Sequence, residues 1–477
     1  MPSSYDDKEE DDDDQSYWPR FLLPNIVDTE DIENYAPGGF HPVHLGDIFD
    51  NGRYKIMHKL GAGGFATVWL ARDETEGVWV ALKIITAKYS TSISCKSSLN
   101  LQAASYLSSQ PTITTELRRF TFNGPNGCHL CLVLPVLGPS MSRVSSGFTS
   151  RLKPWLSRRV GFQATKAVVS MHAQGLCHGD LTTANILFTL NIDHLEEDWV
   201  HHLFEPPLTD VLETESGEAT GPEAPRYIVK ALDFLSSTSN ILTNDVTIID
   251  LDESFPVSSP PKKMLGIPVE FLAPEVAVGL PASPASDIWA LGCCIFRLRS
   301  GEGPFSGYEV TSPADLMKIV HQTIGPMPIE WQDTLWDYDG QPTKDPKKGK
   351  PLSKWQGERP LEDLVRRIWD QPKGDIVQTD ATRRKPIVFR HNEDMLFPPC
   401  FSNMIWKPTA VRVGNTHLYD YNDESTALLE AMPKIAEPEA ALLYDLLSKI
   451  FVYDPTQRPT ANEILDHPWF HLDGQLH

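Results

Sequence analysis

The chain of 477 residues is 41% hydrophobic and 22% charged, so it can bury a large core and is not a wholly disordered, collagenous or coiled-coil protein. Its 42 basic and 64 acidic residues give a net charge of −22, which argues against a nucleic-acid or anionic-membrane binder and permits a cationic partner. Seven cysteines in so long a chain fit a reducing compartment. We expect a cytoplasmic or nuclear monomer whose partners include neither nucleic acid directly nor a membrane.

The first part of the chain combines an acidic tail with strand patterns. Residues 6–14 contain eight acids and one lysine, so residues 1–34 are predicted to be an acidic, disordered tail. β-Branched and aromatic residues then recur at 54–60, 67–71 and 79–85. This composition, arranged around a glycine cluster, predicts a sheet-rich start to the folded part.

The remainder of the chain is mainly helical in pattern. Apolar residues recur at three- and four-residue spacing over 155–172, 287–298 and 440–451, which predicts amphipathic helices. Two stretches near 191–245 and 331–421 interrupt the pattern and are interpreted as insertions. Their arrangement after the strands predicts an α+β fold. We expect the Gly-, Pro- and Glu-containing centre of the first insertion, near 205–225, to be mobile and dispensable.

A glycine-rich run at 61–68, Gly-Ala-Gly-Gly-Phe-Ala-Thr-Val, lies between two predicted strands. Small residues there allow backbone N–H groups to approach phosphate oxygens, although glycine-rich hairpins also occur for purely structural reasons. Lys83 follows 22 residues after Gly61, on a strand that can place its ammonium beside α- and β-phosphates. The two features together favour nucleotide binding.

Three polar side chains farther along the chain suit phosphoryl transfer. Asp180 and Asn185 lie five residues apart in Cys-His-Gly-Asp-Leu-Thr-Thr-Ala-Asn, directly after a predicted helix. A carboxylate there can orient a hydroxyl nucleophile and accept its proton, while a carboxamide can bind a hard cation through oxygen. Asp250 ends an apolar strand and offers a second ligand for Mg²⁺. Each aspartate taken singly could equally cap a turn.

The order of these motifs resembles the protein-kinase signature set, in which a glycine loop precedes a strand lysine, a catalytic loop and a strand aspartate. Ala-Pro-Glu at 273–275 resembles the segment that closes the activation loop. Asp-Ile-Trp-Ala-Leu-Gly at 287–292 resembles the start of the large buried helix. Arg458 stands where the family places the partner of Glu275.

The kinase resemblance covers residues 53–470 and implies a two-lobed fold, with a small sheet-rich N-lobe at 54–138 and a larger helical C-lobe at 139–477. It also implies ATP and Mg²⁺ as cofactors. The site residues that it implies are Asp180 for catalysis, Asn185 and Asp250 for the metal, and, for the nucleotide, Leu60, Gly61, Ala62, Gly63, Gly64, Phe65, Ala66, Thr67, Val68, Ala81, Lys83, Pro135 and Leu137.

A narrower resemblance to the SR-protein kinases rests on the lead-in at 35–53, with Tyr-Ala-Pro-Gly-Gly-Phe-His-Pro-Val, and on Thr-Val-Trp-Leu at 67–70. The hinge is also similar to that of this family. The resemblance makes Leu134 the gatekeeper, and it implies that the Pro135 carbonyl accepts from adenine N6 while the Leu137 N–H donates to N1. It implies a protein serine/threonine kinase that acts on serine in basic Arg/Ser-rich proteins.

Three departures from the kinase pattern bear on activity. Gln102 or Ala103 stands near the place where a helix normally supplies the ion-pair partner of the strand lysine, and the next glutamate comes only at position 116. Thr182 replaces a lysine of the catalytic loop. Asp252 replaces the glycine of the Asp-Phe-Gly type motif. Loss of one preorganised charge can cost on the order of a hundredfold to a thousandfold in rate.

These departures keep two alternatives open. A pseudokinase would use the same fold as a scaffold, with weak or no phosphoryl transfer. A small-molecule phosphotransferase is the other, because His-Gly-Asp at 178–180 also resembles the loop of such enzymes, although the segment around Glu275 counts against it. Retention of the base and both metal ligands favours an active kinase. Because Gly179 replaces the arginine of phosphate-gated kinases, we expect activity without activation-loop phosphorylation.

Overall fold

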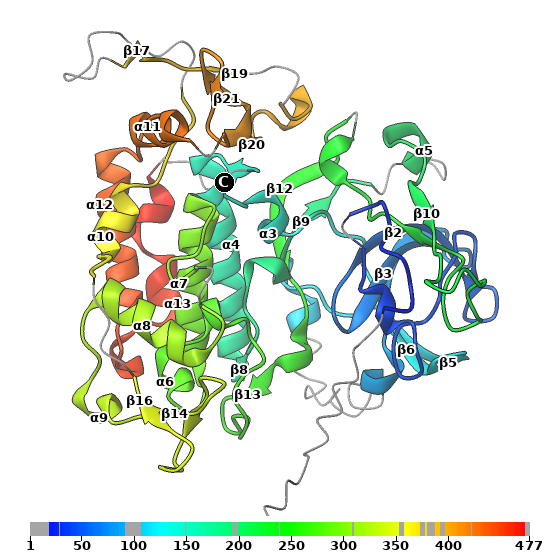
Figure 1. The fold of residues 1–477 in the computed structure, drawn as a ribbon, viewed down its shortest axis with the longest axis horizontal. Helices are drawn as coiled ribbons and strands as arrows, with labels where there is room; N and C mark the ends of the chain where they lie inside the picture. Colours follow the sequence, from blue (N-terminus) through cyan, green and yellow to red (C-terminus); the bar gives the residue numbers. More distant parts are fainter. Residues whose placement is uncertain are drawn as a thin grey trace, which may run out of the picture.

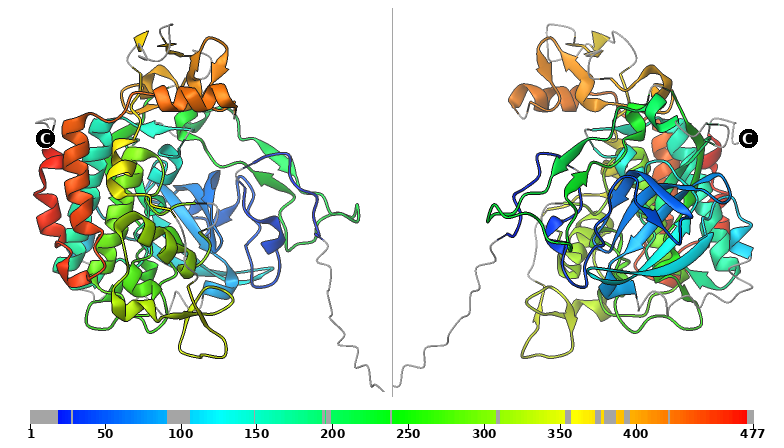
Figure 2. Two further views of the ribbon diagram at one scale, coloured as in Figure 1. Left: turned by 60° about the vertical axis from the view of Figure 1, so that its left-hand side comes forward. Right: turned by 90° about the vertical axis from the view of Figure 1, so that its right-hand side faces the viewer.

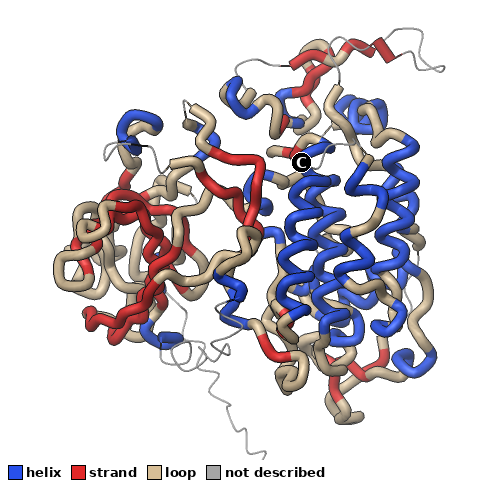
Figure 3. Tube along the Cα trace, turned by 180° about the vertical axis from the view of Figure 1, so that it is seen from behind, coloured by secondary structure: helices blue, strands red, loops and turns tan. Residues whose placement is uncertain are grey.

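The structure is a computed structural model, and the residues that it describes are 19–27, 29–90, 106–147, 149–192, 195, 199–237, 239–307, 310–352, 357–372, 377–378, 387–391, 396–420 and 422–472. Figure 3 shows the strands gathered mainly in one body and the long helices in another. This is the two-lobed α+β arrangement that the sequence predicts, with the N-lobe on the right and the C-lobe on the left of Figure 1. Within the described ranges, no helix has both the length and the apolarity to cross a membrane.

The N-lobe is built on one antiparallel sheet in the order β1-β2-β3-β4-β6-β5. Its strands are β1 (Ile48–Phe49), β2 (Tyr54–Ala62), β3 (Ala66–Asp73), β4 (Val78–Ile85), β5 (Arg118–Gly124) and β6 (Gly127–Leu134). The three strands expected from the sequence fall within β2, β3 and β4 and are confirmed. Side chains such as Trp69, Val80 and Leu82 pack together in the core of this sheet, as their β propensity favours.

The C-lobe is a helical body around two long helices, α4 and α7. Its longest helices are α4 (Pro154–Ala173), α7 (Pro284–Ser300), α8 (Pro313–Ile324) and α12 (Glu437–Ile450). The three helices predicted from apolar spacing, at 155–172, 287–298 and 440–451, are therefore confirmed. Local signals mark the ends of α7, because the Ser283 hydroxyl accepts from the backbone N–H of Ala285 and Gly301 ends the helix at φ +81°.

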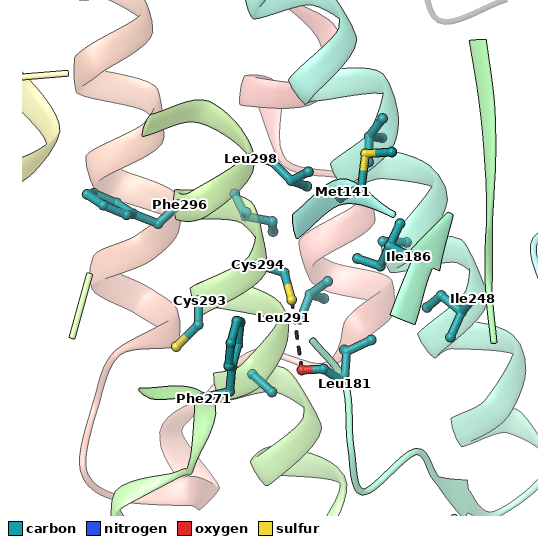
Figure 4. Packing of buried hydrophobic residues seen from close by; sticks show 14 of the residues in the cluster. Met141, Leu181, Ile186, Ile248, Phe271, Leu291, Cys293, Cys294, Phe296 and Leu298 are labelled. Carbon is teal, nitrogen blue, oxygen red and sulfur yellow. Dashed lines mark hydrogen bonds between the residues drawn. The ribbon is translucent and has the colours of Figure 1, made fainter. Parts of the chain in front are cut away.

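The catalytic loop packs against the core of the C-lobe, as Figure 4 shows. Leu181 follows Asp180 directly and is fully buried beside Ile186 and residues of α7. The Cys294 thiol of α7 donates to the Leu181 carbonyl at 3.9 Å. Packing on both sides of the loop therefore limits where the intervening polar side chains can point.

Shorter elements connect these units. The shorter helices are α3 (Met141–Val144), α5 (Trp199–Leu203), α6 (Pro274–Ala277), α9 (Ile329–Gln332), α10 (Leu361–Arg366), α11 (Asp423–Ala431) and α13 (Ala461–Leu465). The strands that pair near the site are β8 (Leu176–Cys177) with β13 (Phe255–Pro256) and β9 (Ile186–Leu190) with β12 (Leu242–Ile248). The first of these pairs ties the segment after Asp250 to the strand before Asp180.

The N-terminal segment and the first insertion fold against each other, which corrects the prediction of a disordered tail over 1–34. β10 (Thr209–Val211) pairs with β11 (Tyr227–Val229), and both views of Figure 2 place this green hairpin beside the blue N-terminal segment. Their shared core is formed by Phe21, Ile32, Tyr35, Phe40, Leu212, Ala224 and Ile228. Each segment alone has too few apolar residues to form a core. The part of the prediction over 1–18 lies outside the described residues.

The centre of the first insertion is anchored at two buried residues, which corrects the expectation of a wholly loose stretch over 205–225, whereas its dispensability stays a prediction. Leu212 and Ala224 are buried. The backbone N–H of Leu22 donates to the Glu213 carbonyl at 2.9 Å, and Asn126 Nδ2 of the N-lobe donates to the Glu223 carbonyl at 2.7 Å. The apolar residues of the insertion are spaced too irregularly to predict a strand. They are nevertheless buried, because the N-terminal segment supplies apolar residues that they pack against.

The second insertion contains small sheets attached to the helical lobe. One sheet joins β14 (Leu335–Trp336), β15 (Pro342–Thr343) and β16 (Lys350–Pro351), and β20 (Ile405–Trp406) pairs with β7 (Arg151–Leu152). The other strands are β17 (Val377–Gln378), β18 (Ile387–Val388), β19 (Arg390–His391), β21 (Val411–Val413) and β22 (Thr416–His417). Phe389, Trp406 and Leu428 are buried in its own small core.

Candidate active site

A cavity of about 1730 Å³ is lined by residues of both lobes. The predicted nucleotide-contact residues that line it are Leu60, Gly61, Ala62, Gly63, Gly64, Phe65, Ala66, Val68, Ala81, Lys83, Pro135 and Leu137. Asn185 and Asp250 line the opposite side, from the C-lobe. The fold thus brings residues that are more than 160 positions apart in the chain to one concave site, the kind of place where small ligands bind.

Thr67 is the exception among the predicted nucleotide contacts. It is buried, and its hydroxyl accepts from Trp69 Nε1 at 3.0 Å. Because side chains alternate between the two faces of a strand, Ala66 and Val68 line the cavity while Thr67 and Trp69 point to the other face of β3. The glycine-loop pattern alone does not tell which residues face the cavity. The prediction of a Thr67 side-chain contact is therefore wrong, because this side chain lies on the other face of the strand.

The glycine hairpin leaves open space over the cavity. The backbone N–H of Gly63 donates to the Ala66 carbonyl at 2.9 Å and closes the turn between β2 and β3. A Cβ atom added at Gly61, Gly63 or Gly64 would meet no other atom within 4 Å. Small residues here therefore keep room for a ligand rather than avoid a clash with the protein itself.

Asp287, at the first turn of α7, holds the backbone of the catalytic loop. Its carboxylate accepts from the backbone N–H of His178 at 2.8 Å and of Gly179 at 3.1 Å, and it also contacts His172 Nε2 at 3.0 Å. Gly179 has φ +79°, and a Cβ atom there would lie 2.5 Å from the Glu253 carbonyl oxygen. The loop therefore requires glycine at this position, so an arginine could not be accommodated without a backbone shift.

Asp180 lies at the end of this rigid loop. Asn185 Nδ2 donates to the Asp180 backbone carbonyl at 2.8 Å and to its carboxylate Oδ2 at 3.1 Å. The other carboxylate oxygen, Oδ1, is buried and accepts no hydrogen bond from the part of the chain that the structure describes. Burial raises the pKa of the Asp180 carboxyl to about 6, and the nearby Asp250 acts in the same direction. Such a carboxylate is prepared to accept a proton.

Asp250 and Lys83 form an ion pair across the cavity. Asp250 adopts the left-handed conformation at φ +65°, and Lys83 Nζ lies 2.9 Å from its Oδ1. Burial would raise the pKa of Asp250, but the ammonium of Lys83 outweighs it and lowers that pKa. The backbone N–H of Ile249 donates to the Asn185 carbonyl at 3.0 Å, which holds the two predicted metal ligands beside each other.

Asp252 is a site residue that the sequence analysis treated only as a departure. Its Oδ2 lies 3.2 Å from Lys83 Nζ, so the lysine is shared between two carboxylates. Burial and the neighbouring Asp250 raise the pKa of Asp252. Glu116 instead bonds Arg119, with an Oε1 to Nη2 distance of 2.6 Å. The sequence signal was available, since residues 84–115 contain no acid at all.

Glu275 anchors the segment that closes the activation loop. Arg458 donates to both of its carboxylate oxygens, at 2.8 Å from Nη1 and 2.7 Å from Nη2, and the Ser286 hydroxyl adds a third hydrogen bond. Both charged groups are buried. The predicted pairing of Glu275 with Arg458 is confirmed. Together with the pairing of β8 and β13, it fixes both ends of the segment between Asp250 and Glu275.

A sheet lobe and a helical lobe that enclose a lysine, two aspartates and an asparagine define a phosphotransferase-type site. The chain belongs to the protein kinase domain family, whose model matches residues 54–196 and 237–470. The unmatched stretch between these ranges lies within the first insertion. The sequence resemblance to protein kinases is therefore confirmed.

Curated relatives place the chain near one group of kinases. Protein kinase dsk1 of Schizosaccharomyces pombe is 31% identical over 42% of this chain and 38% of its own length. SRSF protein kinase 3 of Homo sapiens is 30% identical over 40% of this chain and 36% of its own length. Serine/threonine-protein kinase SRPK of Physarum polycephalum is 26% identical over 64% of this chain and 74% of its own length. The narrower resemblance to SR-protein kinases is confirmed by these names.

Proposed function

We propose that the protein is an ATP- and Mg²⁺-dependent protein serine/threonine kinase that transfers the γ-phosphoryl group to a serine hydroxyl. The observation that carries the proposal is the convergence of Lys83, Asn185 and Asp250 on one cavity, with the Asp180 carboxylate hydrogen-bonded to Asn185 directly behind the cavity wall. These are the groups that phosphoryl transfer needs, because catalysis of this reaction is mostly positioning and electrostatic stabilisation.

The donor set fits a nucleotide and a hard cation. Asn185 uses its Nδ2 on Asp180, so its Oδ1 would be the atom available to a cation, and Asp250 would supply an ionised carboxylate. Oxygen ligands of this kind suit Mg²⁺, which neutralises charge on the phosphates when bound. Lys83 would bind the α- and β-phosphates, and the Pro135 carbonyl and Leu137 N–H would bind adenine.

Asp180 would act on the protein substrate. Its buried, unbonded Oδ1 is the atom that can accept a hydrogen bond from the serine hydroxyl and then its proton. Asn185 orients the carboxylate by its hydrogen bond to Oδ2, and Asp287 holds the loop that carries it. Thr182, where most kinases have a lysine, caps the short turn at 183–185 and brings no positive charge. We therefore expect a slower enzyme than kinases that carry the lysine.

Arg/Ser-rich proteins are the proposed substrate class. Support comes from the lead-in motif, from the name SRSF protein kinase 3 among the relatives and from the net charge of −22. The local field beside α8 is close to neutral, because Asp315 pairs with Lys318 at 3.0 Å and Glu270 pairs with Arg297 at 2.6 Å. Steering of a basic peptide by this surface is therefore expected to be weak.

The test is phosphate transfer from labelled Mg²⁺-ATP to an Arg/Ser-repeat peptide. Asp180→Asn and Lys83→Met should each lower the rate by about a hundredfold or more. Lys88→Met is the matched control, because Lys88 is exposed next to Tyr89 and does not line the cavity. Equal labelling by all four proteins would refute enzymatic transfer and leave the pseudokinase alternative.

The same assay tests the substrate and the mode of activation. A Gln/Ser-repeat peptide should be a poorer substrate than the Arg/Ser peptide. Equal rates on the two peptides would rule out the Arg/Ser substrate class but would leave the kinase activity standing.

Phosphatase treatment should leave the rate unchanged, because Gly179 cannot pair with an added phosphate. Loss of activity after that treatment would contradict the proposed independence from loop phosphorylation.

A further inference from the structure

Lys83 sits between two carboxylates that come from one short turn. Asp250 precedes the 3-10 helix Leu251–Glu253, and Asp252 lies within it. Lys83 Nζ is 2.9 Å from Asp250 Oδ1 and 3.2 Å from Asp252 Oδ2. About a fifth of the Lys83 side chain and a third of each aspartate side chain is exposed, so all three groups face the cavity while staying partly shielded from water.

Hydrogen bonds hold the turn that carries Asp252, so the position of Asp252 is set by the fold. The left-handed backbone of Asp250 starts the turn, and the backbone N–H and hydroxyl of Ser254 both donate to the Leu251 carbonyl, at 3.1 and 2.5 Å. Phe255 then pairs with Cys177 in the strand before the catalytic loop. A carboxylate held this way needs little ordering before it binds an ammonium.

No other acid is available to Lys83 along the part of the chain that ordinarily supplies one. Residues 84–115 contain neither Asp nor Glu. Glu116, which lines the cavity, is engaged by Arg119. Asp250 has a competing task, because a cation bound there would use the same carboxylate that now contacts Lys83. Asp252 is the partner that remains for Lys83 once Asp250 binds the cation.

On these grounds, and resting on the proposed nucleotide-binding function, we propose that Asp252 is a positioning residue that holds Lys83 in the cavity and so releases Asp250 to bind Mg²⁺. It takes over the role of the helix carboxylate that this chain lacks. Without Asp252, the ammonium of Lys83 would be neutralised by Asp250 alone, and the cation would have to compete with it. The signature of this role is therefore a change in Mg²⁺ dependence.

The experiment titrates Mg²⁺ into full-length protein and a fluorescent ATP analogue, and it reads nucleotide binding rather than transfer. Asp252→Asn should raise the Mg²⁺ concentration at half-saturation about tenfold. Asp252→Glu should restore it to within threefold of the unaltered protein. Glu253→Gln is the matched control, since it removes one charge from the exposed side of the same turn and should shift the midpoint less than threefold. Thermal unfolding checks that each variant is folded.

A double-substitution cycle separates this role from its rivals. In a Lys83→Met background, Asp252→Asn should cause no further shift, because there is no ammonium left to hold away from Asp250. A tenfold shift that persists in that background would make Asp252 a metal ligand or a purely structural residue and would overturn the proposal. An unchanged midpoint in Asp252→Asn alone would also overturn it. Nucleotide binding without transfer would defeat the kinase function but leave this test intact, whereas a protein that binds no nucleotide would defeat both.

Discussion

The surroundings of Asp180 decide how well it can serve as a base. Burial raises the pKa of its carboxyl to about 6, and the negative charge of Asp250 acts in the same direction, whereas the hydrogen bond from Asn185 lowers the pKa. A general base works best when its pKa is close to the working pH, because it is then both ionised and basic enough to accept a proton. Burial of Asp180 thus opposes its ionisation, but it also makes the ionised carboxylate a stronger base for the hydroxyl proton.

The first prediction is a fall in activity on acidification. Because Asp180 must be ionised to accept the hydroxyl proton, kcat/KM for the peptide should be flat above pH 7 and should decrease about tenfold per unit below pH 6. The measurement is kcat/KM from pH 5 to 8 at saturating Mg²⁺. The residual rate of Asp180→Asn should lack this limb. A profile that stays flat down to pH 5 would contradict the assignment of Asp180 as the base.

At the scale of elements, the hairpin of β10 and β11 depends on the segment that packs against it. Two strands of three residues are marginal by themselves, so their stability must come from tertiary contact. Within the hairpin, Leu212 is 5% exposed and contributes to the core shared with Phe21 and Ile32, whereas Val211 is 67% exposed. The two neighbouring apolar side chains should therefore contribute very differently to the stability of the fold.

The second prediction compares these two neighbours. Leu212→Ala should destabilise the protein by about 2–5 kcal/mol, because it removes buried methyl groups and leaves a cavity. Val211→Ala should change stability by less than about 0.5 kcal/mol, because its side chain is already in water. Chemical denaturation of both variants measures the difference. Equal effects would mean that the first insertion does not pack as the structure shows.

At the scale of the whole molecule, Lys59 joins three regions that are distant in sequence. Its ammonium contacts the Glu30 carboxylate of the N-terminal segment, and both side chains are buried. Its backbone carbonyl accepts from the N–H of Leu232, within the first insertion, at 2.9 Å. The next residue along β2, Leu60, lines the cavity between the lobes. The N-terminal segment therefore supports the strand that carries the glycine hairpin.

The third prediction uses two truncations. Removal of residues 1–18 should leave stability nearly unchanged, whereas removal of residues 1–34 should cost about 3–5 kcal/mol or more, because it leaves the buried ammonium of Lys59 without its carboxylate. Adding Lys59→Met to the longer truncation should recover part of the loss. Thermal unfolding of the three proteins measures the effect, and equal midpoints for both truncations would contradict the packing of the N-terminal segment.

Local sequence patterns were sufficient for much of the fold. Strands at 54–60 and 79–85 and helices at 155–172 and 287–298 follow from composition and apolar spacing, because such patterns express contacts with one buried face. The same reasoning failed at 205–225. Its few apolar residues have no regular period, and they are buried only because the N-terminal segment brings a second apolar surface.

The sequence by itself determined the kinase class, because the motifs that carry it follow one another in a characteristic order, and it placed Asn185 beside Asp180, because the two residues lie five positions apart in one loop. Only the tertiary structure decided which side chain partners Lys83, since Asp252 is 169 residues away and meets it where the two lobes face each other. Only the structure shows that the Thr67 side chain lies outside the cavity, because its position along the strand sets the face to which it points. Ion pairing and burial depend on where distant segments meet in space, and spacing along the chain does not encode that meeting.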